Sequence, residues 1–154
     1  MADFHAENRY FRIVPLGDFG IAGDFEVARV HVGIREALSP LARSPVAVRL
    51  HTLEGEPLVT NLTQIAEELI DLPVEVPAQM DVPFSNAVVP MGRTLVIELF
   101  IPGGLERRDD LATGRGENGA SRSGFLDPPC RAEPAPIHTT LDVHLVMTVY
   151  GRER

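Results

Sequence analysis

Five histidines are the side chains of this 154-residue chain best suited to metal binding or acid–base chemistry. A zinc site needs three or four ligands that converge on one point. No two histidines show HxH or HExxH spacing, which would bring ligands together on one element. We therefore interpret the histidines as solvated or interfacial, and we expect His31 and His51 to point outward from neighbouring strands. The full set is His5, His31, His51, His138 and His144.

Acidic and amide side chains cluster between residues 106 and 118, where they could offer oxygen ligands to calcium. Their spacing fits no EF-hand loop, and three arginines interleave with them. Interleaved charges are typical of a solvated loop, and they also suit a contact between subunits in which charges set the register. The oxygen-bearing residues are Glu106, Asp109, Asp110, Glu117 and Asn118, and the arginines are Arg107, Arg108 and Arg115.

The potential nucleophiles lack surroundings that would activate them. Ser121 and Ser123 do not belong to a GxSxG motif between a strand and a helix. Cys130 has neither a predicted helix N-terminus nor a paired histidine beside it to lower the pKa of its thiol. The sequence therefore predicts a protein that is not an enzyme, with no catalytic residue, no cofactor and no metal.

The composition restricts the partners that we expect. Twenty-two acidic and 14 basic residues give a net charge of −8, which argues against nucleic acid and against an anionic membrane surface. Every basic residue is an arginine, a side chain that favours planar, bidentate contacts at interfaces. The one cysteine excludes an intrachain disulfide, and no apolar run approaches the roughly 18 residues of a membrane helix.

Short elements must position these side chains, because 13 prolines and 13 glycines divide the chain into brief apolar runs. Many of these runs alternate apolar and polar residues, a pattern typical of an all-β sandwich or barrel. The length suits one domain, residues 1–154. Strands are expected at residues 9–14, 24–34, 45–53, 79–89, 93–101 and 139–150.

Three segments carry further information. Both faces of residues 93–101 carry apolar side chains, with Glu98 among them, which predicts a central strand or one covered on both sides. Pro83 interrupts residues 79–89 and indicates an edge strand or a bulge. Residues 61–72 have apolar side chains at helical spacing, so a two-turn helix is an alternative to a strand there.

Two segments are expected to contact other molecules. Residues 103–124 form the longest stretch without periodicity, and irregular loops of this length are usually functional or disordered. Residues 1–12 hold three aromatic side chains and are interpreted either as an N-terminal arm that packs on a neighbour or as a locally packed first strand. The predicted interface residues are Phe4, Tyr10, Phe11, Arg107, Arg108, Asp109, Asp110, Arg115 and Arg122.

Five stretches of the chain carry a resemblance to a known family. They are residues 23–34, 45–53, 89–100, 118–130 and 144–149, and they include the motifs PVAVRLHTL and NGASRSGFLDPPC. In order and spacing they resemble the β-sandwich domain of the choice-of-anchor type, found in secreted and surface-anchored bacterial proteins. The resemblance spans about residues 11–151. It implies a jelly-roll-like antiparallel β-sandwich of about eight strands, makes residues 61–72 a strand, and supplies no catalytic residue.

The sequence departs from that family in showing neither a leader peptide nor an anchor after Gly151. We therefore expect a free-standing, homo-oligomeric subunit of a larger assembly such as a capsid. The specific prediction is a phage or phage-like virion accessory protein in the virion or a cytoplasmic assembly: a capsid decoration (cement) subunit or a head or tail appendage. The alternative is a carbohydrate-binding or adhesion module of an extracellular bacterial surface protein, with a glycan as its partner.

Overall fold

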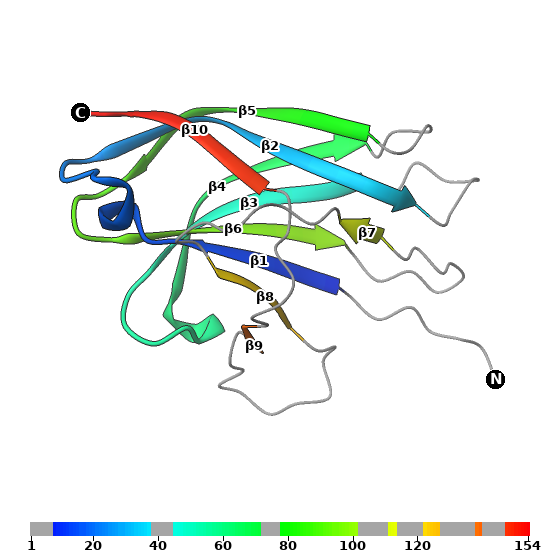
Figure 1. Cartoon of the computed structure of the whole chain (residues 1–154), viewed down its shortest axis with the longest axis horizontal. Helices are drawn as coiled ribbons and strands as arrows, with labels where there is room; N and C mark the ends of the chain where they lie inside the picture. Colours follow the sequence, from blue (N-terminus) through cyan, green and yellow to red (C-terminus); the bar gives the residue numbers. More distant parts are fainter. Residues whose placement is uncertain are drawn as a thin grey trace.

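Two antiparallel β-sheets packed face to face make up the fold (Figure 1). The computed structural model describes residues 8–37, 45–71, 78–101, 111–113, 122–126, 138–139 and 147–154. Within these ranges the chain forms strands and two short 3-10 turns, with no α-helix. The all-β sandwich expected from the sequence is therefore confirmed.

The larger sheet has six strands in the order β4-β3-β6-β1-β8-β9. Its central strands, β6 and β1, each pair antiparallel with a neighbour on both sides. The strands are β1 (Asn8–Val14), β3 (Pro45–Leu53), β4 (Leu62–Asp71), β6 (Thr94–Ile101), β8 (Arg122–Leu126) and β9 (His138–Thr139).

The smaller sheet has the order β10-β2-β5, and a short strand, β7, pairs with the end of β2. Two 3-10 turns, η1 after β1 and η2 before β4, lie in the connections. The elements are β2 (Phe25–Ala37), β5 (Ala78–Val89), β7 (Leu111–Thr113), β10 (Met147–Glu153), η1 (Leu16–Phe19) and η2 (Val59–Asn61).

The core between the sheets follows directly from the alternation along each strand. Successive side chains of a strand point to opposite faces, so every second residue of β3 and β6 enters the core. Each aliphatic side chain buried in this way contributes about 1.5–3 kcal/mol of transfer free energy. The fully buried aliphatic residues of these two strands on this face are Val46, Val48, Leu50, Leu95, Ile97 and Leu99.

Part of the outer face of the larger sheet is buried as well. Phe11, Ile13, Leu53 and Val96 form a second apolar cluster there, with exposed fractions between 0 and 8%. The prediction that residues 93–101 form a central strand covered on both faces is therefore confirmed: β6 lies between β3 and β1 and is apolar on both sides.

Two of the open alternatives are resolved by strand pairing. Residues 62–71 form β4, paired antiparallel with β3 along its length, so the helical alternative is wrong. Backbone hydrogen bonds to a neighbouring strand outweigh the weak helical preference of so short a segment. Pro83 does lie in an edge strand beside a bulge, since the pairing of β2 with β5 shifts register between Val27 and Arg29.

The expectation of one irregular loop over residues 103–124 needs correction. That range contains β7, and it also includes the first residues of β8, which pairs with β1. Pairing through backbone groups requires no apolar alternation, so the sequence pattern gave no sign of these strands. In the described ranges, no helix has the length and apolar character needed to cross a bilayer.

Candidate functional site

A buried carboxylate on the outer face of the larger sheet gathers the densest set of charged groups. Strand register places Glu98 of β6 directly opposite Arg49 of β3 on one side and Phe11 of β1 on the other. One oxygen of Glu98 accepts a hydrogen bond from Arg9 Nε at 2.5 Å, and the other accepts one from His51 Nε2 at 2.6 Å. A guanidinium nitrogen of Arg49 lies 3.6 Å from the first oxygen. We call these four residues the Glu98 cluster.

The electrostatics of the cluster keep the carboxylate ionised. Burial would raise the pKa of Glu98, whose side chain is fully buried, but the hydrogen bonds from His51 and Arg9 outweigh burial and lower the pKa below its usual value. Because Nε2 of His51 donates to the carboxylate, Nδ1 is its remaining polar atom. That atom is buried and has no hydrogen-bond partner among the described residues.

The Glu98 cluster fits a structural role better than a reactive one. Arg49 continues the network by donating from Nε to Glu67 of β4 at 2.5 Å, and its guanidinium lies 3.9 Å from the centre of the Phe100 ring. The charges thus connect four adjacent strands, β4, β3, β6 and β1. Neither of the two cavities described below is lined by a residue of the cluster.

The first cavity is a shallow groove of about 620 Å³ on the smaller sheet, here called the Tyr150 groove. It lies where the register shifts twice, between Val27 and Arg29 and between Tyr150 and Gly151. Of its two aromatic lining residues, Phe84 is buried, whereas Tyr150 is 44% exposed and has the Arg29 guanidinium 4.3 Å from its ring centre. The lining residues are Glu26, Val27, Ala28, Arg29, Phe84, Ser85, Asn86, Tyr150, Gly151 and Arg152.

One side of the Tyr150 groove is fixed by ion pairs with the end of the chain. Glu26 accepts hydrogen bonds from Arg152 Nε at 2.7 Å and from Arg154 Nη2 at 2.6 Å. The hydrogen bond from Arg152 is the largest cause that lowers the pKa of Glu26. The groove therefore offers an aromatic ring beside charged and amide groups, a combination that can bind a polar ligand with a flat apolar face.

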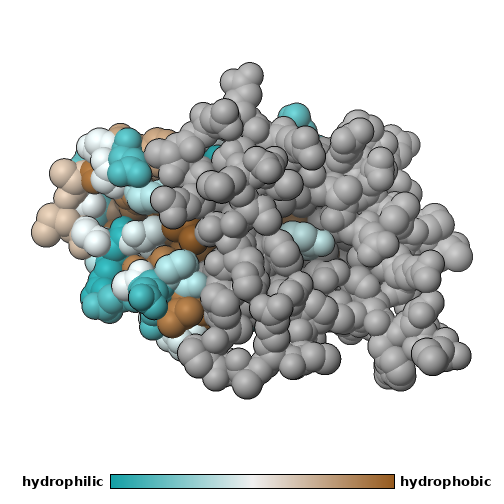
Figure 2. Space-filling view, turned by 60° about the horizontal axis from the view of Figure 1, so that its bottom comes forward, coloured by the Kyte–Doolittle hydropathy of each residue, from teal (hydrophilic) through white to brown (hydrophobic). Residues whose placement is uncertain are grey.

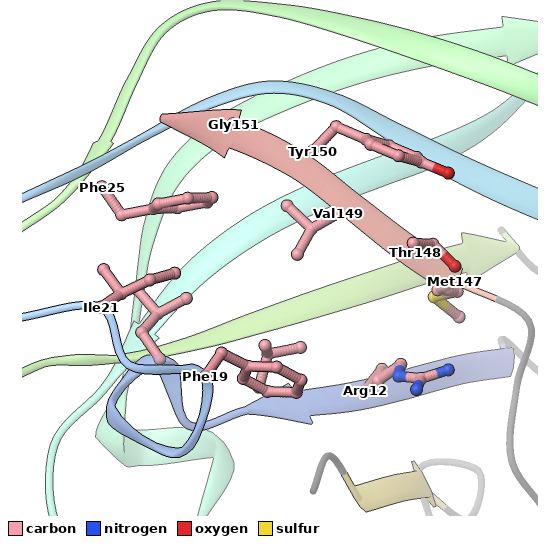
Figure 3. A pocket seen from close by; sticks show the side chains of 11 residues that line it. Arg12, Phe19, Ile21, Phe25, Met147, Thr148, Val149, Tyr150 and Gly151 are labelled. Carbon is pink, nitrogen blue, oxygen red and sulfur yellow. The ribbon is translucent and has the colours of Figure 1, made fainter. Parts of the chain in front are cut away.

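The second cavity is a pocket of about 390 Å³ at the side of the sandwich where β1 faces β10, here called the intersheet pocket (Figure 3). Apolar side chains from β1, η1, β2 and β10 make up most of its wall. Among the described residues that line it, Arg12 is the charged one, and burial lowers the pKa of its guanidinium below the usual value. Phe19 also lines it and is 53% exposed.

The described histidine side chains do not assemble into a metal site. His31 lies in β2 of the smaller sheet and His51 in β3 of the larger one, so the expectation that they occupy neighbouring strands is wrong. His31 Nδ1 is 2.8 Å from one carboxylate oxygen of Asp81, and a guanidinium nitrogen of Arg29 lies 3.9 Å from the other. Among the described residues, no group of three or more histidine, cysteine, aspartate or glutamate side chains could hold a metal ion.

Most of the predicted interface residues cannot be placed. Phe4, Arg107, Arg108, Asp109, Asp110 and Arg115 lie outside the described residues, as do Cys130 and the rest of the mixed-charge segment 106–118 apart from residues 111–113. Arg122 begins β8, next to β1. Tyr10 and Phe11 belong to β1, where Tyr10 packs against the core and Phe11 is fully buried, as in the alternative of a locally packed first strand.

Sequence reasoning missed both the Glu98 cluster and the two cavities. The one available signal for the cluster was a carboxylate within the apolar strand 93–101. Its partners, Arg9 and His51, are 89 and 47 residues away in the chain, so only the strand order brings them together.

With this geometry in hand, the chain was compared with known proteins. No protein-family model, curated protein or solved structure matches it. The resemblance to the choice-of-anchor domain therefore stays a prediction, and the function has to be argued from the described surfaces.

Proposed function

We propose that the chain is a non-catalytic structural and binding subunit of a larger protein assembly. In its most specific form, it is a phage or phage-like virion accessory protein, either a capsid decoration subunit or a head or tail appendage. It would associate with copies of itself and with the shell. By binding only the assembled form, such a subunit stabilises that form by mass action.

The observation that supports association is the free edge of β4. This ten-residue strand ends the larger sheet, and in the described part of the chain no strand pairs with its outer side. An edge of this length presents backbone N–H and C=O groups that can pair with a strand of another molecule. Leu69 of β4 is 69% exposed, which adds an apolar anchor to the backbone groups.

The rigidity of the larger sheet also supports a mechanical role. Its central strands are packed on both faces, and the Glu98 cluster ties β4 to β3, β6 and β1. A contact made at β4 is therefore transmitted to the centre of the sheet. The virion version rests additionally on analogy, since compact β-sandwiches and jelly rolls recur in capsid proteins.

The test is to measure the mass of the native complex that contains the protein, purified from its source, and then to repeat the association with Leu69→Lys. The charged side chain beside the edge should oppose pairing with another strand. We expect wild-type protein to co-sediment with a particle at fixed stoichiometry and the variant to bind at least tenfold more weakly.

Met91→Lys is the matched control, because Met91 is 67% exposed but lies in the turn between β5 and β6. It should associate like the wild type. A free monomer at every concentration, with no particle that it joins, would refute the assembly proposal. If Leu69→Lys and Met91→Lys lost the same amount of affinity for the particle, β4 would not be the site of association.

A second function, carbohydrate binding, is favoured by the Tyr150 groove. Sugars stack on aromatic rings and hydrogen-bond to nearby polar side chains, and here Tyr150 lies beside Asn86 and Glu26. A glycan array should then give binding that Tyr150→Ala removes and that Leu69→Lys leaves intact. No glycan bound by the wild type would reject this second function.

A further inference from the structure

We propose that the edge of β4 binds an extended segment of a different protein, one that carries arginine or lysine side chains among apolar ones. The inference rests on the proposed function, because it names the partner of the same edge. It differs from the association of two copies of the chain through β4, and the experiments below separate the two.

The geometry of β4 allows another strand to be added to the larger sheet. β4 pairs with β3 along its whole length through one side, and in the described part of the chain no strand pairs with its other side. Figure 1 shows β4 at the side of the sandwich, next to β5 of the smaller sheet. Six of its ten residues are exposed, so a strand from another molecule can reach both the backbone and the side chains.

The charge of β4 favours a basic partner. The strand contains three acidic residues, Glu67, Glu68 and Asp71, and no basic residue. Glu67 pairs with Arg49 of β3, whereas Glu68 and Asp71 add exposed negative charge along the edge. Charges at the border of a contact select the partner, because they attract an opposite charge and repel a like one.

The order of side chains along β4 gives the pattern that the partner needs. From Ala66 to Asp71 the residues are apolar, acidic, acidic, apolar, apolar and acidic. Side chains directly opposite each other in an antiparallel pair stabilise it when both are apolar or when their charges are opposite. The complementary segment is therefore basic, apolar, apolar, basic, basic and apolar. Its second apolar residue covers Leu69, which is 69% exposed.

A second copy of β4 fits the same edge less well. When all ten residues of two β4 strands pair antiparallel, residue 66 of one strand lies opposite residue 67 of the other. Glu67 and Glu68 of both copies then lie around the two-fold axis of the pair. Like charges on neighbouring strands destabilise the pairing, so charge favours a strand of a different sequence.

The experiment compares two peptides with blocked ends, TRVVRRVT and TQVVQQVT, which share their apolar pattern and differ in charge. At low ionic strength, calorimetry on the wild-type protein should give saturable binding of the arginine peptide that is at least tenfold tighter than that of the glutamine peptide. High salt should reduce this difference, because it screens exposed charges. Hydrogen exchange should show protection of the β4 amides by the arginine peptide. Equal affinity for the two peptides, or protection confined to other strands, would overturn the proposal.

A charge reversal on β4 then locates the contact. Glu68→Lys should weaken binding of the arginine peptide at least tenfold and leave the glutamine peptide unchanged. The matched control is Asp18→Lys, which makes the same change in net charge at an exposed position of η1, outside the larger sheet. It should bind both peptides like the wild type. Equal losses in Glu68→Lys and Asp18→Lys would contradict β4 as the site, and if Glu68→Lys fails to fold, the two peptides on the wild type still decide.

Sedimentation of the protein alone tests the second copy as the occupant. Dimerisation of the wild type that Leu69→Lys abolishes would overturn the proposal in favour of self-pairing. The proposed function fails separately from this inference. A protein that joins no particle but prefers the arginine peptide loses its role in an assembly and keeps the basic partner, whereas a protein that joins a particle and binds both peptides equally keeps the role and loses the basic partner.

Discussion

The Glu98 side chain is fully buried, although it lies on the outer face of the larger sheet. Removing a carboxylate from water costs several kcal/mol unless partners compensate for it. Glu98 has such partners in Arg9 and His51, and its neighbours Phe11 and Phe100 are covered by the guanidinium groups of Arg9 and Arg49 at 5.2 and 3.9 Å from their ring centres. The charges and the rings therefore protect each other from water.

Replacing Glu98 with glutamine should destabilise the fold strongly. Glu98→Gln keeps the shape of the side chain but removes the buried negative charge that pairs with Arg9. We expect the free energy of unfolding to fall by about 2–4 kcal/mol, somewhat less than for a fully buried pair because the Arg9 side chain is 18% exposed. Urea denaturation measures this loss.

The matched control is Glu54→Gln, because Glu54 pairs with Arg93 but its side chain is 74% exposed. Exposed ion pairs contribute little, so this variant should unfold close to the wild-type midpoint. A Glu98→Gln variant as stable as the control would show that the Glu98 cluster does not stabilise the sheet.

Lowering the pH should reduce the free energy of unfolding, because it protonates Glu98. The pKa of Glu98 in the folded state lies below its unfolded value of about 4.3, so its contribution to stability is complete above that pH. The contribution is lost as the pH falls through the folded pKa. The free energy of unfolding should therefore drop below about pH 4.5, and this drop should be shallower in Glu98→Gln. Identical acid slopes in the two proteins would contradict a lowered pKa.

At the level of the elements, the bulge in β10 depends on a glycine. A Cβ atom at Gly151 would collide with the backbone oxygen of Glu26 and would lie 2.6 Å from the Phe25 ring. β10 and β2 shift register at this point, and the close approach is what brings Glu26 to the Tyr150 groove. Glycine is thus required by space rather than by its backbone angles.

Gly151→Ala should lower the free energy of unfolding by about 1–3 kcal/mol, the usual cost of overpacking. Gly17→Ala in η1 is the control, because a Cβ atom there would meet nothing within 4 Å. Thermal denaturation of the two variants gives the comparison. If both variants have the melting temperature of the wild type, β10 and β2 can move apart at the bulge at little cost in free energy.

Alternation predicted most of the strands, but a single strand over residues 139–150 is wrong: Thr139 belongs to β9 of the larger sheet, and β10 of the smaller sheet begins at Met147. β3 was predicted with its exact bounds, Pro45–Leu53, and the double-sided burial of β6 followed from apolar residues on both faces. Residues 62–71 were ambiguous because an edge strand needs little burial, so its apolar spacing is weak. The pairing of β7 with β2 and of β8 with β1 left no pattern in the sequence, since backbone hydrogen bonds between strands need no apolar alternation.

The candidate sites were beyond sequence reasoning for a different reason. His51 was expected to point outward from its strand, but the sequence did not show which strands flank it. The Glu98 cluster, the Tyr150 groove and the intersheet pocket each join segments from distant parts of the chain. The order of the strands in each sheet determines these contacts, and that order cannot be read directly from a single sequence.

At the level of the whole molecule, the two sides of the sandwich differ. β4 and β5 lie beside each other at one side, whereas the intersheet pocket occupies the opening between β1 and β10 at the other (Figure 1). Figure 2 shows hydrophobic residues interleaved with hydrophilic ones over the described part of one face, without a single large apolar area.

The different positions of β6 and β4 in the sheet predict different rates of amide hydrogen exchange. β6 has a paired strand on each side and is buried on both faces, so its amides should exchange only through global unfolding. β4 has one free edge and half-exposed side chains, so its outer amides should exchange through local opening, faster by at least tenfold. In an assembly that pairs along β4, those amides should become protected while those of β6 stay unchanged. Protection at β10 instead of β4 would move the contact to the other side of the sandwich and refute the β4 edge as the site of association.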